Sequence, residues 1–118
     1  MFALFDDIKE LKNNEKIVVA VSGGIDSLSL TLLANDWAKK NNIKIIGITV
    51  DHGLRKSSYD EAVYINHLLK KFNIEHHILI WEDKKPTHNI ENIAREARYN
   101  LIFDFCRKNK ILSFHFFI

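Results

Sequence analysis

Residues 16–27 have the sequence KIVVAVSGGIDS, and this stretch decides the fold. Its first half, residues 16–21, is a short apolar run rich in valine, which is typical of a strand buried in a parallel sheet. A loop with two glycines, residues 22–27, follows at once, and a helical pattern begins directly after it. The order of strand, glycine loop and helix predicts the first βαβ unit of an α/β domain.

Strands and helices continue to alternate along the rest of the chain. We predict further strands over residues 43–50, 77–81 and 111–118, and a short amphipathic helix over residues 2–11. Apolar residues at helical spacing mark the three intervening helices: they are Leu30, Leu33, Ala34, Trp37 and Ala38, then Ile65, Leu68, Leu69 and Phe72, then Ile90, Ile93, Ala94, Ala97 and Leu101. This order predicts a three-layer αβα domain with a parallel sheet and right-handed crossovers.

Composition narrows the class of protein. The chain has 118 residues, enough for one domain, and 47% of them are hydrophobic and 27% charged, which excludes intrinsic disorder. A net charge of +2 argues neither for nor against nucleic-acid binding. The one cysteine excludes an internal disulfide. With neither a signal peptide nor a long apolar span, we expect a cytoplasmic protein without membrane contact.

Four further sequence features predict helix caps and the environments of two histidines and one cysteine. Ser58 and Glu61 have the spacing of a capping box, and Asn89 suits the N-cap of the last helix. The neighbouring histidines at 76 and 77 should face opposite sides of a strand, so we do not expect them to share a metal ion. Cys106 lies on an apolar helix face, and we expect it to be buried and inert.

The first loop predicts an anion site, because ligands of parallel α/β sheets bind beyond the carboxyl ends of the strands. Gly23 and Gly24 would permit unusual φ values and close approach of the backbone, and Ser22 and Ser27 offer hydroxyl groups. N–H groups at the start of a helix attract phosphate. The loop is neither a Walker A motif nor a dinucleotide-binding fingerprint.

Asp26 is the unexpected member of this loop, because phosphate would repel a carboxylate. A Mg²⁺ ion between the two resolves the conflict, since Mg²⁺ takes one or two carboxylates together with phosphate oxygens. The alternative is a plain glycine turn in which Asp26 caps the following helix.

Three motifs together resemble one known family. The SGGIDS of residues 22–27 resembles the PP-loop of the N-type ATP pyrophosphatases. The VDHGLR of residues 50–55, and residues 89–99 with the pattern N-x-E-x-x-A-R-x-x-R-Y, are similar to motifs of the tRNA(Ile)-lysidine synthetases. The resemblance spans residues 16–107 and implies the Rossmann-like fold of the adenine nucleotide alpha hydrolases.

The resemblance also implies an activity. Enzymes of this family use ATP and Mg²⁺ to adenylate the wobble cytidine of an isoleucine tRNA, and free lysine then displaces AMP to give lysidine. The specificity of the tRNA thereby changes from methionine to isoleucine. The substrates implied are therefore tRNA(Ile), free lysine and ATP, while the oligomeric state stays open.

Roles for individual residues follow from the same resemblance. Positions matching the PP-loop would bind ATP phosphates, with Asp26 also holding the metal and acting in catalysis; they are Ser22, Gly23, Gly24, Ile25, Asp26 and Ser27. Asp51 and His52 would lie near the adenosine, although His52 could equally cap a turn. Arg95 and Arg98, catalytic by resemblance, would offer positive charge one helical turn apart; taken without the family, they are solvated helix charges.

The last residues depart from the family pattern. A segment H-H-x-x-D-D-x-x-E-T follows the last helix in the family, and only His115 matches it here. We therefore expect residues 1–118 to form a single PP-loop ATP-binding domain that is incomplete at its C-terminal end. Two alternatives remain: a catalytically inactive nucleotide-binding remnant, and another PP-loop enzyme such as a tRNA cytidine thiolase, whose C-x-x-C cysteines the single Cys106 does not supply.

Overall fold

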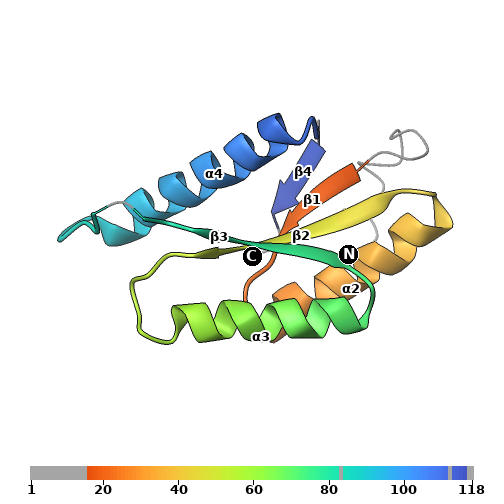
Figure 1. Ribbon diagram of the computed structural model, residues 1–118, viewed down its shortest axis with the longest axis horizontal. Helices are drawn as coiled ribbons and strands as arrows, with labels where there is room; N and C mark the ends of the chain where they lie inside the picture. The colour runs from red at the N-terminus through yellow and green to blue at the C-terminus, as the bar shows by residue number, and fades with distance from the viewer. Residues whose placement is uncertain (1–15, 83, 112, 117–118) are drawn as a thin grey trace.

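The computed structural model describes residues 16–82, 84–111 and 113–116. The helix expected over residues 2–11 lies outside these ranges. The elements, in chain order, are β1 (Lys16–Ala20), α2 (Ile25–Lys40), β2 (Lys44–Asp51), α3 (Ser58–Lys71), β3 (Glu75–Ile80), α4 (Ile90–Lys108) and β4 (Ser113–Phe116) (Figure 1). The predicted alternation of strands and helices is thus confirmed, and no strand bound shifts by more than two residues.

The four strands form one parallel sheet in the order β3-β2-β1-β4. Helices α2 and α3 cover one face of this sheet and α4 covers the other (Figure 1). The predicted three-layer αβα architecture is therefore correct, and it resembles the Rossmann fold. Strands β1 and β2 occupy the centre, so the loops that follow them emerge side by side at the carboxyl edge of the sheet.

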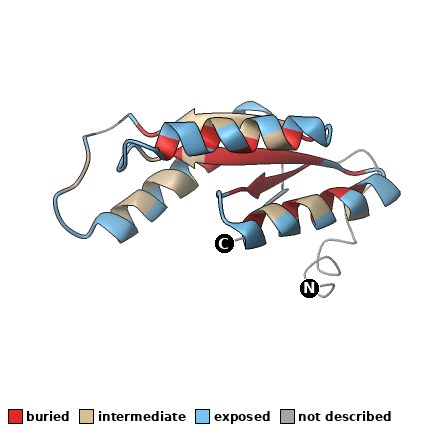
Figure 2. Ribbon diagram, turned by 90° about the horizontal axis from the view of Figure 1, so that it is seen from below, coloured by how far each residue is buried: buried red, intermediate tan, exposed pale blue. Residues whose placement is uncertain are grey.

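The core consists of two layers separated by the sheet. Ile17, Val19 and Val21 pack against α2 and α3, while Val18 and Ala20 face α4. This alternation is the period-two pattern of a strand buried on both faces. Figure 2 shows the consequence, with buried residues concentrated in the strands and exposed residues on the outer faces of the helices.

Helix α2 packs four of its five predicted core residues against the sheet, Leu30, Ala34, Trp37 and Ala38, but not Leu33. Leu33, expected in the core, is 40% exposed, whereas Ser27 and Thr31 are fully buried beside Ala34. The Thr31 hydroxyl donates to the Ser27 carbonyl at 2.8 Å, which satisfies its buried proton inside the helix. Small side chains thus form the buried face of α2, and the larger leucines flank it. Phe72 and Ile90, also assigned to apolar stripes, are 47% and 41% exposed.

Two predicted caps differ in the structure. Ser58 is the first residue of α3 rather than its N-cap, and its hydroxyl turns to Asp51 instead of forming a capping box with Glu61. Asn89 is the N-cap of α4, as predicted, but it adopts a left-handed conformation with φ of 53° and makes no side-chain cap. Its Oδ1 accepts from the Asn92 side chain at 3.0 Å.

The two histidines face opposite sides of the sheet and Cys106 is buried, as predicted. His76 faces α3 and contacts Asn66, whereas His77 faces α4 and lies 5.0 Å from the Phe105 ring. Cys106 is buried in the α4 layer, and this burial raises the pKa of its thiol. Among the helices described, none has the length and apolar character that crossing a membrane requires.

Candidate functional site

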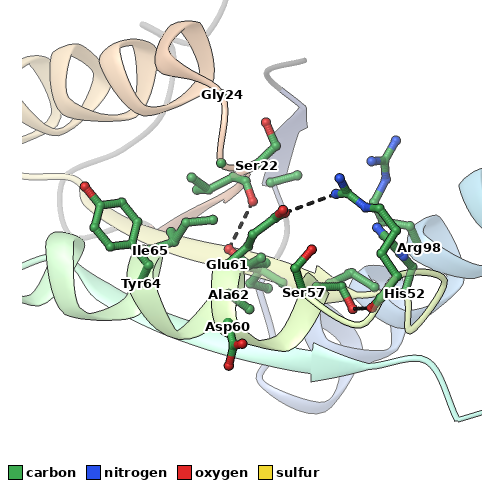
Figure 3. A pocket seen from close by; sticks show the side chains of 18 residues that line it. Ser22, Gly24, His52, Ser57, Asp60, Glu61, Ala62, Tyr64, Ile65 and Arg98 are labelled. Carbon is green, nitrogen blue, oxygen red and sulfur yellow. Dashed lines mark hydrogen bonds and ion pairs between the residues drawn. The ribbon is translucent and has the colours of Figure 1, made fainter.

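A cavity of about 700 Å³ opens at the carboxyl edge of β1 and β2. This volume is in the range that accommodates a nucleotide-sized ligand. Loops 22–24 and 52–58, the first two turns of α3, and α4 surround it; the lining residues are Ala20, Val21, Ser22, Gly23, Gly24, Ile48, Thr49, Val50, His52, Arg55, Ser57, Ser58, Asp60, Glu61, Ala62, Tyr64, Ile65 and Arg98. In Figure 3, Tyr64 and Ile65 lie at one end and His52 and Arg98 at the other.

A hydrogen bond ties the two ends of the first loop together: the Ser22 N–H donates to the Ser27 hydroxyl oxygen at 3.0 Å. Gly24 lines the cavity and is the N-cap of α2, where it has no side chain with which to cap the helix. The first N–H groups of a helix lack acceptors within the helix. The positive end of α2 therefore lies at the cavity, as an anion site requires.

The two glycines of this loop do not supply the unusual φ values that the sequence predicted. Neither has a positive φ; Gly24 is extended, with φ of −69°. A Cβ atom at Gly23 would come no closer than 4.0 Å to Ile65 Cδ1, so it would stand in the cavity itself. These positions leave room for a ligand to approach the backbone, and the unusual φ belongs to Gly53 in the second loop, at 64°.

The other predicted members of the first loop lie around the cavity rather than in its wall. Ile25 and Asp26 are exposed on the first turn of α2, and Ser27 is buried beneath the loop. Within the described residues, no three histidine, cysteine or acidic side chains gather as a metal site. A single carboxylate on the first turn of α2 still suits Mg²⁺, which would complete its coordination with phosphate oxygens and water.

The second loop is held by its own polar side chains. Asp51 is buried, and its Oδ1 accepts the Gly53 N–H at 3.0 Å and the Ser58 hydroxyl at 2.5 Å. His52 Nδ1 accepts the Leu54 N–H at 3.0 Å. Of the two predicted adenosine-binding residues, Asp51 thus builds the loop, and His52 both caps a turn and lines the cavity.

Two arginines make one end of the cavity positive. Burial lowers the pKa of His52, and the charges of Arg55 and Arg98 lower it further, against the opposing effect of Asp51 and Glu61. His52 is consequently neutral at physiological pH, and the arginines carry the positive charge. Figure 3 shows Arg98 beside His52, with the side chain entering from α4.

Arg95 and Arg98, predicted as a pair, lie in different environments. Arg98 is half-buried and lines the cavity, while Arg95 is exposed and contributes nothing to its lining. The catalytic roles assigned to both remain predictions, and the geometry favours Arg98.

The structure also adds residues that the motifs did not identify. Asp60, Glu61 and Tyr64 on α3 line the cavity, and Glu61 forms an ion pair of 3.1 Å with Arg55. The rule that directed attention to the carboxyl ends of strands applies equally to the helix after β2. The first turn of α3 could therefore have been found from its position directly after the DHGLR segment.

Most of this chain is similar in sequence to curated tRNA(Ile)-lysidine synthases. The tRNA(Ile)-lysidine synthase of Rickettsia rickettsii (strain Sheila Smith) is 43% identical over 97 residues, which are 82% of this chain and 20% of that protein. Its counterpart in Orientia tsutsugamushi (strain Boryong) is 41% identical over 101 residues, 86% of this chain and 23% of that protein. The chain thus spans about a fifth of the length of these curated relatives.

A solved structure and a family model extend the comparison. The U34-tRNA thiolase NcsA from Methanococcus maripaludis, with its [4Fe-4S] cluster, matches with a TM-score of 0.78 at 24% identity, over 90% of this chain and 38% of that one, which shows a shared fold. Residues 3–115 match the model of the PP-loop domain. The glycine loop at the head of α2 and this match over nearly the whole chain place the protein in the PP-loop domain family.

Proposed function

We propose that this chain is the ATP-binding part of a tRNA(Ile)-lysidine synthetase, which joins lysine to the wobble cytidine of an isoleucine tRNA. The observation that carries the proposal is the cavity at the head of α2, lined by Ser22, Gly23 and Gly24, in a chain 43% identical to a tRNA(Ile)-lysidine synthase. Because the match covers only 20% of that relative, lysine ligation and tRNA binding belong to the proposal. Cytoplasmic location is part of it, since that is where tRNA is modified.

Different residues in and around the cavity bind different parts of MgATP. Backbone N–H groups at Gly24 and the first turn of α2 would receive the phosphates, and Asp26 would hold the Mg²⁺ that offsets their charge. Apolar side chains of the wall, Ile48 and Ile65 among them, exclude water from the nucleotide. ATP supplies the AMP that activates the C2 oxygen of cytidine, with diphosphate as the leaving group.

Arg98 is the residue of α4 best placed to stabilise charge during the reaction. It lies in the wall of the cavity, opposite α3, where its guanidinium group can donate several hydrogen bonds. A fixed positive charge favours a transition state in which phosphate charge develops. Arg55, at the same end, is engaged with Glu61 at 3.1 Å and becomes available to phosphate when that ion pair opens.

The thiolase alternative has less support. The one cysteine of the 118 residues, Cys106, is buried in the α4 layer among Ile102 and Ile111, on the far side of the sheet from α3. A [4Fe–4S] cluster requires several thiolates facing one site. The likeness to the thiolase NcsA, at 24% identity, concerns the fold alone.

Calorimetry with MgATP and the 118-residue chain tests the proposal. We expect saturable binding that weakens when EDTA removes Mg²⁺, followed by incorporation of labelled lysine into tRNA(Ile) when the chain is supplemented with the rest of a related synthetase. A folded chain that does not bind MgATP would instead support the inactive-remnant alternative.

A further inference from the structure

A chain of buried polar side chains lies beneath the first loop, on the side of the sheet that faces α3. The Thr49 hydroxyl lies 3.0 Å from the Val21 carbonyl oxygen and 2.7 Å from His76 Nε2. On the other side of the ring, His76 Nδ1 lies 2.9 Å from Asn66 Oδ1. Thr49 and His76 are both more than nine-tenths buried.

The space for the His76 ring is made by a glycine in the centre of β2. Gly47 pairs with His76 across the sheet, and a Cβ atom at Gly47 would lie 3.3 Å from His76 Cδ2 and 3.1 Å from Leu69 Cδ1. Glycine weakens a strand interior and usually marks the close approach of another group. Here the group that approaches is the imidazole ring of His76, which occupies the space that a side chain at Gly47 would need.

The direction of each hydrogen bond follows from counting protons. Thr49 has one hydroxyl proton, and the Val21 carbonyl can only accept, so Thr49 donates to Val21. The Thr49 oxygen then accepts from His76 Nε2–H. Burial, and after it the charges of His77 and Lys70, lower the pKa of His76 to about 4, so the ring is neutral and Nδ1 carries no proton. An unprotonated Nδ1 needs a donor, and Asn66 supplies one when its side-chain amide is turned so that the NH₂ group, rather than Oδ1, faces the ring.

The peptide group at the end of this chain is the one that begins the loop. Its carbonyl, from Val21, accepts from Thr49, and its N–H, from Ser22, donates to the Ser27 hydroxyl. Just before it, the Val21 N–H donates to the Ile48 carbonyl at 2.8 Å. The backbone is therefore fixed on every side immediately before it reaches Gly23.

We propose that His76 is a positioning residue for the ATP-binding loop. It orients the Thr49 hydroxyl toward the Val21 carbonyl, and this sets the direction in which the backbone of Gly23 and Gly24 enters the cavity. His76 does not line the cavity and acts only through Thr49. The inference rests on the proposed function, since it assigns His76 a role in a site that binds ATP.

Calorimetric titration of MgATP into the 118-residue chain and its variants tests this role. His76→Leu keeps an apolar body but removes the Nε2 donor, and we expect the Kd for MgATP to rise about tenfold, the effect of one lost hydrogen bond. His76→Gln places an amide N–H where Nε2–H lies and should restore affinity to within about twofold of the wild type. The matched control is His77→Leu, on the same strand but facing α4, which should leave the Kd unchanged.

Each outcome decides between the two proposals. If the wild type binds MgATP and His76→Leu binds equally well, the positioning role is wrong and the proposed function stands. If the folded wild type does not bind MgATP, both fall. Should His76→Leu fail to fold, Thr49→Val replaces it, because it keeps side-chain volume and removes the hydroxyl; unchanged affinity in this variant would also overturn the inference. A thermal unfolding curve for each variant separates loss of binding from loss of fold.

Discussion

The two loops at the carboxyl edge of the sheet are built in opposite ways. Loop 22–24, after β1, is exposed and carries its glycines toward the cavity. Loop 52–57, after β2, uses its polar groups on itself, through the buried carboxylate of Asp51 and the ring of His52. The first loop leaves the N–H groups of a helix terminus open to a ligand, whereas the second satisfies its own backbone. Substitutions in the first should therefore change binding, and substitutions in the second should change stability.

The largest contrast is expected from the glycines. Gly23→Val would place a side chain in the cavity, 4.0 Å or more from protein atoms, so we expect MgATP affinity to fall by at least about a hundredfold with little change in unfolding. Gly53→Val puts a β-branched residue at a φ of 64° and should cost about 1–2 kcal/mol of stability while MgATP still binds. Calorimetry and urea unfolding of both variants measure the two effects. Normal binding by Gly23→Val would mean that the loop is only a turn.

The two aspartates provide the next contrast. Asp51→Ala leaves the Gly53 N–H and the Ser58 hydroxyl without their buried acceptor, and we expect a loss of about 2–3 kcal/mol in the free energy of unfolding. Asp26→Ala removes an exposed carboxylate, so stability should not change, but the Mg²⁺ dependence of ATP binding should disappear. Urea unfolding and calorimetry with and without Mg²⁺ check the pair. An Asp26→Ala variant that keeps its Mg²⁺ dependence would overturn the metal assignment.

Much of this contrast could be anticipated from the sequence. Strands alternate with amphipathic helices, and that order alone gives a parallel sheet with loops 22–27 and 51–56 at one edge. The motif residues then selected the loop that faces the cavity. The sequence did not indicate which aspartate builds a loop and which is free, because both Asp26 and Asp51 follow a strand and precede a helix.

Other features depend on packing distances that no periodicity contains. Helix α2 approaches the sheet through Ser27 and Thr31 as well as the predicted alanines, and hydrophobic spacing cannot identify buried polar residues. Ser58 has the spacing of a capping residue, but a buried carboxylate on β2 competes for its hydroxyl and wins. The role of Gly47 was equally invisible, since the ring that fills its space comes from β3, 29 positions further along the chain.

The supports of the two loops should also differ in their response to acid. His76, beneath the first loop, has its pKa lowered to about 4 chiefly by burial, while an unfolded histidine titrates near 6.5. Between these values the unfolded chain binds more protons, so stability falls as the pH drops from 6.5 toward 4 and this contribution is lost below that. From pH 7 to 5 we expect a loss of about 2 kcal/mol that is absent in His76→Gln. Urea unfolding of the wild type and of His76→Gln across this range measures the loss. If the free energy of unfolding falls equally in both proteins, the assignment is wrong.

The smallest effect on MgATP binding is expected at the ion pair between Arg55 and Glu61, which lies in the cavity wall. Both side chains line the cavity and are largely exposed, so the pair is weak and a phosphate can displace the carboxylate. Glu61→Gln removes a negative charge that repels phosphate and releases Arg55, and we expect MgATP to bind about threefold more tightly at low salt. The gain should shrink at high salt, and Glu91→Gln, on the exposed first turn of α4, serves as the control. Weaker binding by Glu61→Gln would mean that this carboxylate itself holds the ligand or its metal, and helix α3 would then share the binding role assigned to the first loop.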